Sequence, residues 1–291
     1  MSFCDENYFI ILELSLFSSL SKIPQLFYTI RPATFHAAVS LELLHTASLV
    51  HDDVVDESTE RRGQLSVNAV FNNKVAVLAG DFLLATSLVH AGKTMSHEII
   101  SVVSCLGQDL ADGELLQLSN VSNPHFSEEI YFDVIRKKTA ALFAACTKSA
   151  ALSVNASDEE AEFSRLFGEY IGICFQIKDD IFDYFESKEI GKPTGNDMLE
   201  GKLTLPVLYA LNSTNSTWAQ EIAVKVKEGI ATPDEIGRLV DFTKSNGGIE
   251  YAVKMMKLYK GKALDLLHSL PPSEVCTALE AYLDYVVDRD K

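Results

Sequence analysis

Residues 49–56 read Leu-Val-His-Asp-Asp-Val-Val-Asp, and residues 175–183 read Phe-Gln-Ile-Lys-Asp-Asp-Ile-Phe-Asp. Each stretch places acidic residues at positions i, i+1 and i+4 inside an apolar pattern of helical period. On a helix, positions i and i+4 lie one above the other, about 5–6 Å apart at Cβ, so these carboxylates repel each other. A single acidic run is usually solvated surface, but two copies in apolar surroundings predict a functional pair.

Carboxylate oxygens are the hard ligands that Mg²⁺ prefers, and Mg²⁺ sites usually complete their shell with water and substrate phosphates. We therefore expect a diphosphate to be held by Mg²⁺ between two acidic helices. The metal ligands expected from the two motifs are Asp52, Asp53, Asp56, Asp179, Asp180 and Asp183.

Composition narrows the class of protein. The chain has 291 residues, of which 47% are hydrophobic, so it can form one large domain or two ordinary ones. A net charge of −16 argues against nucleic acid, whose partners need basic surfaces. Five scattered cysteines without CxxC spacing favour a reducing, cytoplasmic location. We find no apolar run of about 18 residues and no complete signal peptide, so no transmembrane segment is expected.

The hydrophobic pattern predicts an all-α fold. Long proline-free stretches carry apolar residues at three- and four-residue spacing, and no sustained alternation of period two occurs. Helices are expected over residues 35–56, 75–91 and 98–119, from Ser127 towards Ala151, from Ser157 through the second acidic motif, after Thr232 and after Pro272. Residues 193–206 are expected to form a loop. We predict a large single-domain helix bundle over residues 33–291, preceded by an atypical N-terminal segment, residues 1–32.

Larger motifs add a family resemblance. The run from His45 to Gly63 resembles the first aspartate-rich motif of the trans-isoprenyl diphosphate synthases, and the run from Phe175 to Asp183 resembles the second. The stretch from Gly191 to Pro206 resembles the glycine-rich segment that follows. The likeness spans roughly residues 33–290 and is strongest to the long-chain polyprenyl synthases, which implies the isoprenoid synthase fold.

The resemblance implies that isopentenyl diphosphate is joined head to tail to an allylic diphosphate, assisted by three Mg²⁺ ions. Charge develops on the pyrophosphate leaving group, so cations aimed at it stabilise the transition state more than the ground state. The resemblance also implies a homodimer. A peripheral membrane contact for product release stays open.

Site residues follow position by position from the same resemblance. Asp52 and Asp56 bind metal from one helix and Asp179 from the other, while Asp53, Asp180 and Asp183 are outer or secondary ligands. Arg61 contacts the allylic diphosphate and Arg62 the isopentenyl diphosphate, because the planar fork of arginine suits phosphate oxygens. The further assignments are Lys138 and Thr139 on the allylic diphosphate, Gln176 beside the allylic group, Lys192 and Lys202 closing over the diphosphate, and His45 at the isopentenyl site. Asp52, Asp56, Lys138 and Asp179 carry the catalytic roles.

Two small residues bear on product length. Ala47 and Ser48 lie about one turn before Asp52, and helical side chains lean towards the N-terminus, so both positions lie deeper than the metal site. In the family, large aromatics here give short products. Ala47 and Ser48 therefore imply a product beyond C20, in the C30–C50 range. The alternative is that small residues merely permit close helix packing.

One family feature is missing from the sequence. The Gly-Lys-x-x-Arg-Pro segment that binds isopentenyl diphosphate is not found, and Arg31-Pro32 lacks the preceding Gly-Lys. Two alternative functions stay open: a class I terpene cyclase, and a catalytically weak or regulatory subunit of a heteromeric synthase. The complete acidic motifs and the paired arginines favour chain elongation.

Overall fold

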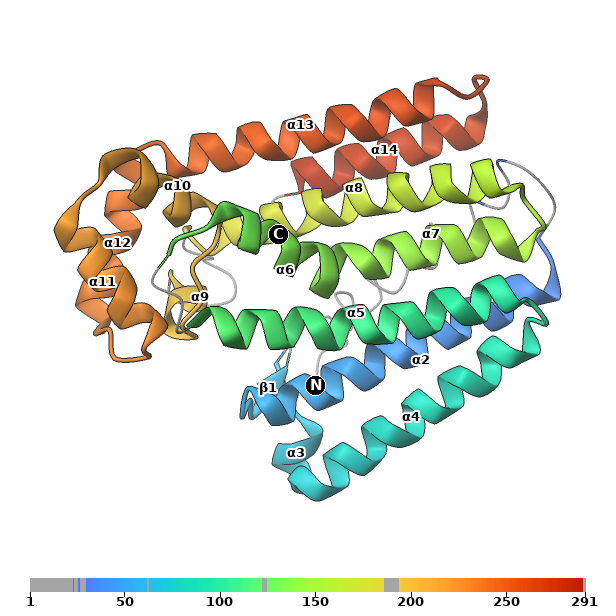
Figure 1. Cartoon of the computed structure of the whole chain (residues 1–291), viewed down its shortest axis with the longest axis horizontal. Helices are drawn as coiled ribbons and strands as arrows, with labels where there is room; N and C mark the ends of the chain where they lie inside the picture. Colours follow the sequence, from blue (N-terminus) through green and yellow to red (C-terminus); the bar gives the residue numbers. More distant parts are fainter. Residues whose placement is uncertain are drawn as a thin grey trace, which may run out of the picture. The chain divides into compact units, whose positions relative to one another are not determined.

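The computed structural model describes residues 30–61, 63–121, 125–185 and 194–289, together with the single positions 23 and 26. This part of the chain is mostly helical, which confirms the predicted all-α fold (Figure 1). It groups into two compact units. Unit 1 comprises residues 1–110, 141–168 and 273–279, and unit 2 comprises residues 111–140, 169–272 and 280–291. The predicted boundary at residue 32 stays a prediction.

Unit 1 is centred on α2 (Pro32–Val55), which begins with a proline in its first turn, where the missing N–H is not needed. Helix α4 (Asn73–Lys93) lies alongside α2 (Figure 1). The buried residues of α4 are all small: Ala76, Gly80, Ser87 and Ala91. Ser40 and Ser87 exchange hydroxyl-to-carbonyl hydrogen bonds of 2.9 and 2.7 Å across this contact. Small residues and satisfied hydroxyls thus let the two helices pack closely.

On another side, α2 packs against α7 (Ala141–Ser153), where the hydroxyls of Thr34 and Ser153 are 2.7 Å apart. Unit 1 also holds α3 (Val67–Val70) and a two-stranded hairpin of β1 (Glu60–Arg61) and β2 (Gln64–Leu65). Helices α5 (His97–Val121), α8 (Asp158–Phe182) and α14 (Glu274–Asp288) contribute residues to both units.

Unit 2 contains α6 (Glu128–Ile135), the π-helical turn η1 (Arg136–Ala140), α9 (Asn196–Leu199), α10 (Leu205–Thr214), α11 (Thr217–Lys227), α12 (Pro233–Ser245) and α13 (Gly248–His268). Its core brings together Tyr184, which follows α8, with Leu211, Ile222 and Leu239 from α10, α11 and α12. Burial of these apolar side chains stabilises the unit, at roughly 25 cal/mol per Å² of apolar surface.

Three local features differ from the sequence prediction. The hairpin β1–β2 was not predicted, because strands of two residues are too short to show an alternating pattern. The predicted loop at residues 193–206 contains the short helix α9. The helix predicted from Ser127 to Ala151 is interrupted by η1, whose wider turn no residue pattern announces.

Helix α4 also bears on the membrane prediction. Among the described residues it is the one helix long and apolar enough to cross a membrane by length and composition, with a mean hydropathy of 1.6. Uninterrupted apolar runs do not reveal this helix, because Asp81 lies inside it. A single helix of this kind is weak evidence for a membrane span. It does show that much of this apolar helix is not buried within the chain.

Candidate active site

The first acidic motif forms the C-terminal end of α2. Asp52 and Asp53 occupy its last turn, and Asp56 follows the helix as its C-cap. Asp53 is buried at 4% exposure, whereas Asp52 is half-buried and Asp56 exposed. The three carboxylates that the sequence grouped together thus lie at three different depths, and Asp53 is the one that needs compensation for its lost hydration.

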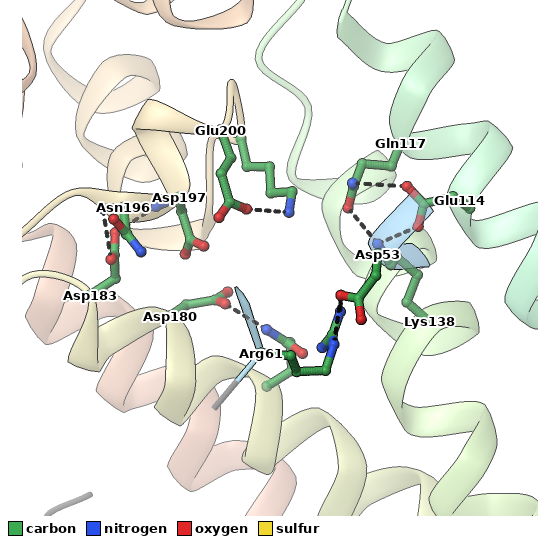
Figure 2. Close-up of polar contacts among 12 residues, drawn as sticks. Asp53, Arg61, Glu114, Gln117, Lys138, Asp180, Asp183, Asn196, Asp197 and Glu200 are labelled. Carbon is green, nitrogen blue, oxygen red and sulfur yellow. Dashed lines mark hydrogen bonds and ion pairs between the residues drawn. The ribbon is translucent and has the colours of Figure 1, made fainter. Parts of the chain in front are cut away.

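Arg61 provides that compensation. Its Nε and Nη2 atoms each lie 2.8 Å from Oδ1 of Asp53, as Figure 2 shows. The hairpin β1–β2 brings Arg61 back towards α2, and Gly63 makes its turn with a φ of +76°, a conformation that favours glycine. The amide of Asn68 bonds the carbonyl oxygen of Asp53 at 3.1 Å. Arg62 lies outside the described residues, so its predicted role is not tested.

His51, which precedes Asp52, connects the first acidic motif to α4. Its Nε2 atom lies 3.2 Å from the carbonyl oxygen of Val77 and 3.4 Å from Asp81. A Cβ atom at Gly80 would lie 2.2 Å from the same Nε2, so the ring occupies space that only a glycine leaves open. Sequence analysis gave His51 and Gly80 no role, because their proximity arises from the packing of two helices.

The two residues linked to product length lie on different faces of α2. Ala47 is 2% exposed and falls on the stripe of Ser40 and His51, both of which contact α4. Ser48 is half-buried, lies one turn before Asp52 on the same stripe, and donates its hydroxyl to the carbonyl oxygen of His45 at 2.8 Å. Ser48 therefore lies one helical turn before Asp52, on the face of α2 that carries it, whereas Ala47 lies on the face that packs against α4.

The second acidic motif lies at the C-terminal end of α8, in unit 2. Asp180 is 2% exposed and accepts hydrogen bonds from Tyr131 at 2.5 Å and from Gln176 at 2.8 Å. The hydroxyl of Thr139 donates to the Gln176 side-chain oxygen at 2.7 Å. The structure thus joins the predicted substrate residues Thr139 and Gln176 to Asp180, and it adds Tyr131, which the sequence did not single out.

Asp183 accepts hydrogen bonds from the backbone at the start of α9. Its two oxygens accept the backbone N–H groups of Asn196 at 2.8 Å and Asp197 at 3.2 Å (Figure 2). This contact brings a fourth acid, Asp197, close to the motif. Asp197 lies within the segment that resembles the family, but the sequence assigns it no role, because three acids already complete the motif.

Electrostatic strain concentrates at Asp180 and Asp197. Burial raises the pKa of Asp180 to about 7, and the charges of Asp179 and Asp183 add to this, while the hydrogen bonds from Tyr131 and Gln176 oppose it. Burial, followed by the charges of Asp180 and Asp183, raises the pKa of Asp197 well above its usual value. Clustered carboxylate oxygens under such repulsion are a donor set that suits a hard divalent cation.

Lys138 is held by α5. Its Nζ atom forms an ion pair with Glu114 and donates to the side-chain oxygen of Gln117 at 3.3 Å (Figure 2). It lies on η1, and a Cβ atom at Gly113 would lie 3.0 Å from Cγ of Lys138 and 2.8 Å from Cβ of Lys137. Single π-helical turns are common at functional sites. The wide turn and the glycine together let Lys138 approach α5.

Lys202 follows α9 and stays close to the second motif. Its Nζ atom donates to Glu200 at 2.6 Å, and its backbone N–H donates to the carbonyl oxygen of Asp197 at 2.8 Å. Gly201, with a φ of +78°, makes the turn between them. Lys192, predicted to act with Lys202, lies outside the described residues.

Asp179 has a cationic partner of its own. Nη2 of Arg289, the residue after α14, lies 2.6 Å from Oδ1 of Asp179. Partial burial raises the pKa of Asp179, and the Arg289 charge and hydrogen bond oppose that shift. Arg289 lies 110 positions from Asp179 in the sequence, so no local pattern could have linked the two.

The fit of a metal depends on donor chemistry. Within the described ranges, no three His, Cys, Asp or Glu side chains are already arranged to hold an ion. The carboxylates at hand are nevertheless the ligand type that Mg²⁺ and Ca²⁺ require. The residues present therefore fit a hard cation chemically, and the first and second motifs are each built within their own unit.

Comparison with known proteins identifies the family. The polyprenyl synthetase family matches residues 18–242. Octaprenyl diphosphate synthase of Haemophilus influenzae is 36% identical over 254 residues, which cover 87% of this chain and 77% of that protein. The structure of geranylgeranyl pyrophosphate synthase from Bacteroides thetaiotaomicron is 64% identical with a TM-score of 0.86, covering 96% of this chain and 92% of that chain.

A third comparison concerns ligands. Polyprenyl synthase from Caulobacter crescentus, complexed with calcium and isoprenyl diphosphate, is 30% identical with a TM-score of 0.87, covering 96% of this chain and 85% of that chain. That structure therefore combines the same fold with a divalent metal and an isoprenyl diphosphate. Sequence match, fold and acidic motifs agree, and the chain belongs to the polyprenyl synthetase family as a prenyltransferase with the isoprenoid synthase fold.

Proposed function

We propose that this polyprenyl diphosphate synthase condenses isopentenyl diphosphate with an allylic diphosphate on three Mg²⁺ ions held by the two acidic motifs. The observation that carries the metal assignment is the cluster of Asp180, Asp183 and Asp197, in which Asp183 bonds the backbone of Asp197. Burial, followed by neighbouring carboxylate charges, raises the pKa of both Asp180 and Asp197. Bound Mg²⁺ supplies positive charge to the diphosphate as the allylic C–O bond breaks.

The chain's own cations assist. Arg61 and Lys138 are held by Asp53 and Glu114, so both positive charges are oriented before substrate arrives. Arg61 has further N–H donors that a phosphate oxygen can accept. Because the positions are set in advance, little reorganisation is needed when charge develops on the leaving group. Thr139 and Gln176 add neutral hydrogen-bonding groups next to Asp180.

We propose an all-trans product of C30–C50. The support is that Ser48, a small residue, lies one turn before Asp52 on the same face of α2, where its short side chain would obstruct a growing chain less than a large one. The octaprenyl relative agrees with this range. A C20 product is the second candidate, because the 64% identical structure is that of a geranylgeranyl pyrophosphate synthase.

An assay separates chain elongation from cyclisation and from a regulatory role. A class I terpene cyclase would consume an allylic diphosphate without isopentenyl diphosphate. A regulatory subunit would be inactive alone. We also propose a homodimer that uses the apolar exposed face of α4, which includes Leu78, Phe82 and Val89. We further propose a cytoplasmic location, supported by the reduced thiols of Cys105, Cys146 and Cys174 in the described part of the chain.

The test is an assay of the purified chain with Mg²⁺, labelled isopentenyl diphosphate and allylic primers of C10, C15 and C20. Elongated products of C30–C50 would support the proposal. Asp52→Asn and Asp179→Asn should each abolish most turnover, while Asp241→Asn, an exposed acid on α12, should not. Products that stop at C20 would favour the second candidate. Cyclised hydrocarbons, or no turnover without a second protein, would contradict elongation by this chain.

A further inference from the structure

We propose that Arg289 limits Asp179 to a single free carboxylate oxygen and thereby favours Mg²⁺ over Ca²⁺ at the second acidic motif. The inference rests on the proposed function, in which Asp179 is a metal ligand. It assigns to Arg289 a positioning role, because the guanidinium acts on the metal through Asp179.

Arg289 is anchored independently of Asp179. Its Nη2 atom donates to the carbonyl oxygen of Phe175 at 3.1 Å, and its Nε donates to that of Val286 at 3.3 Å. The guanidinium carbon lies 4.1 Å from the ring centre of Phe175 and 5.4 Å from that of Phe182. The side chain is only 11% exposed. Two carbonyls and two rings therefore hold the cation in place, which makes its displacement by a metal ion costly.

Asp179 is engaged on one side. The 2.6 Å ion pair is made through Oδ1, and a charge-assisted contact of this length is among the stronger hydrogen bonds in proteins. The Asp179 side chain is 40% exposed, so an ion can reach it from solvent. A metal ion can then bind through Oδ2 while Arg289 keeps Oδ1.

Mg²⁺ and Ca²⁺ differ in how many oxygens of one carboxylate they coordinate. Mg²⁺ demands octahedral geometry at about 2.0–2.1 Å and takes one oxygen per carboxylate readily. Ca²⁺ takes six to eight ligands at about 2.3–2.6 Å and often binds both oxygens of one carboxylate. A guanidinium on Oδ1 takes up part of the acceptor capacity of that oxygen and would place its own charge beside a chelated ion, so binding through both oxygens is disfavoured. Ca²⁺ therefore loses a ligand at Asp179, whereas Mg²⁺ loses none.

The ratio of the Mg²⁺ and Ca²⁺ affinities separates the effect on the second carboxylate oxygen from Coulomb repulsion by Arg289. The positive charge of Arg289 weakens the binding of both divalent ions by Coulomb repulsion, and it does so almost equally because the ions carry the same charge. Only the loss of the second oxygen separates them. The measured quantity is thus the dissociation constant for Mg²⁺ divided by that for Ca²⁺.

The experiment titrates Mg²⁺ alone and Ca²⁺ alone into the full chain by calorimetry, at one pH and ionic strength. Arg289→Gln should tighten Ca²⁺ relative to Mg²⁺ by roughly tenfold, about the value of one charge-assisted contact. Arg289→Met keeps the apolar stem on the phenylalanine rings and should give the same shift, so it replaces Arg289→Gln if that variant fails to fold. Arg289→Lys keeps a cation on Oδ1 and should preserve the wild-type ratio.

Lys260→Gln is the matched control. It removes one positive charge from an ion pair with Asp284, 2.7 Å apart, between α13 and α14, and should leave the ratio unchanged. An unchanged ratio in folded Arg289→Gln and Arg289→Met would overturn the inference. Asp179→Asn distinguishes a failure of the metal assignment from a failure of the role proposed for Arg289. If it does not weaken Mg²⁺ binding, the metal assignment of the proposed function fails as well; if it does, only the role of Arg289 is lost.

Discussion

Asp180 is the residue at which stability and activity conflict most clearly. It is almost fully buried beside other acids, and its two hydrogen-bond donors, Tyr131 and Gln176, are both neutral. Breaking a buried acid's pairing or leaving it charged costs several kcal/mol in typical cases, so the cluster is tolerated only if a proton or a cation compensates it. The same arrangement that destabilises the free protein prepares it for a cation.

The first prediction is a pH dependence of stability in the absence of metal. The folded-state pKa of Asp180, about 7, lies above its ordinary value of 3.8. Between these pH values the folded state holds a proton that the unfolded state has lost. The free energy of unfolding therefore falls as pH rises from about 4 to about 7, and it stays low above that. Thermal unfolding at pH 5 and pH 7.5 measures the difference.

Asp180→Asn should flatten this dependence, because the amide cannot titrate. The variant also removes the Asp180 charge that helps raise the pKa of Asp197, but burial and Asp183 still raise it, so a smaller slope should remain. Adding Mg²⁺ with pyrophosphate should raise the melting temperature of the wild type at pH 7.5 in a concentration-dependent manner. A wild-type protein that is equally stable at both pH values without metal would contradict the first prediction.

The second prediction uses the different faces of Ala47 and Ser48. Ser48→Tyr places a ring one turn below Asp52, on the stripe of the acidic motif, and should shorten the product towards C15–C20 while the first condensation is retained. Ala47→Tyr places the ring against α4, where Ala47 is 2% exposed. Overpacking of this kind typically costs about 1–3 kcal/mol, so this variant should mainly lower the melting temperature.

Product chromatography and thermal unfolding of both variants separate the two effects. If Ser48→Tyr makes products of wild-type length, Ser48 does not face the growing chain. The sequence alone treats the two positions as equivalent, since both are small and both precede Asp52 by about one turn. Only the contacts of Ser40 and His51 with α4 distinguish their faces.

At the scale of elements, the glycine of α5 and the π-helical turn act together. Gly113 allows η1 to approach, and η1 carries Lys138 to Glu114 and Gln117. Helix interiors disfavour glycine by about 1 kcal/mol relative to alanine, so its presence here indicates a packing requirement. The sequence predicted Lys138 as a substrate residue from a short motif, but it could not predict the turn that positions it.

The third prediction is that Gly113→Ala displaces Lys138. The added methyl group would lie 2.8 Å from Cβ of Lys137 and 3.1 Å from the backbone nitrogen of Lys138. The KM for the allylic diphosphate should rise severalfold, and the melting temperature should fall. Gly92→Ala is the control, because that helical glycine has no neighbouring atom within 4 Å of an added Cβ. It should stabilise slightly, by about 0.5–1 kcal/mol, and leave kinetics unchanged.

Kinetics at saturating isopentenyl diphosphate provide the measurement. A KM increase confined to Gly113→Ala would support the role of the wide turn. Equal behaviour of the two glycine variants would show that η1 tolerates the extra methyl group and that Lys138 is not positioned by this contact.

At the scale of the whole molecule, the sequence predicted what depends on local pattern. Helical period predicted the all-α fold and most helix positions, and the two acidic motifs predicted where charge gathers. Long-range contacts could not be predicted from local patterns. Tyr131 and Asp180 are 49 positions apart, and Arg289 and Asp179 are 110 positions apart. Asp197 lies in the glycine-rich segment that resembles the family, yet its closeness to Asp183 depends on the unpredicted helix α9.

The exposed face of α4 raises the last question at this scale. Three of its large apolar side chains, Leu78, Phe82 and Val89, are more than half exposed and recur at helical spacing. Monomeric soluble proteins rarely expose contiguous apolar patches of this kind, so a second copy or a membrane should cover it. A second copy is favoured, because a membrane would have to accommodate the charge of Asp81 on this helix, which is costly in lipid.

The fourth prediction is that Phe82→Glu converts a dimer into a monomer. The wild type should elute as a dimer by size exclusion with light scattering, because stable interfaces bury about 1,200–2,000 Å² and need an apolar centre. Phe82 is 71% exposed in the single chain, so a glutamate there should not disturb its own fold, but it would be desolvated at the interface. Val224→Glu, an exposed apolar position on α11, is the matched control and should stay dimeric. A wild type that is monomeric in buffer yet sediments with phosphatidylcholine vesicles, with Phe82→Glu abolishing that sedimentation, would assign the face of α4 to a membrane instead.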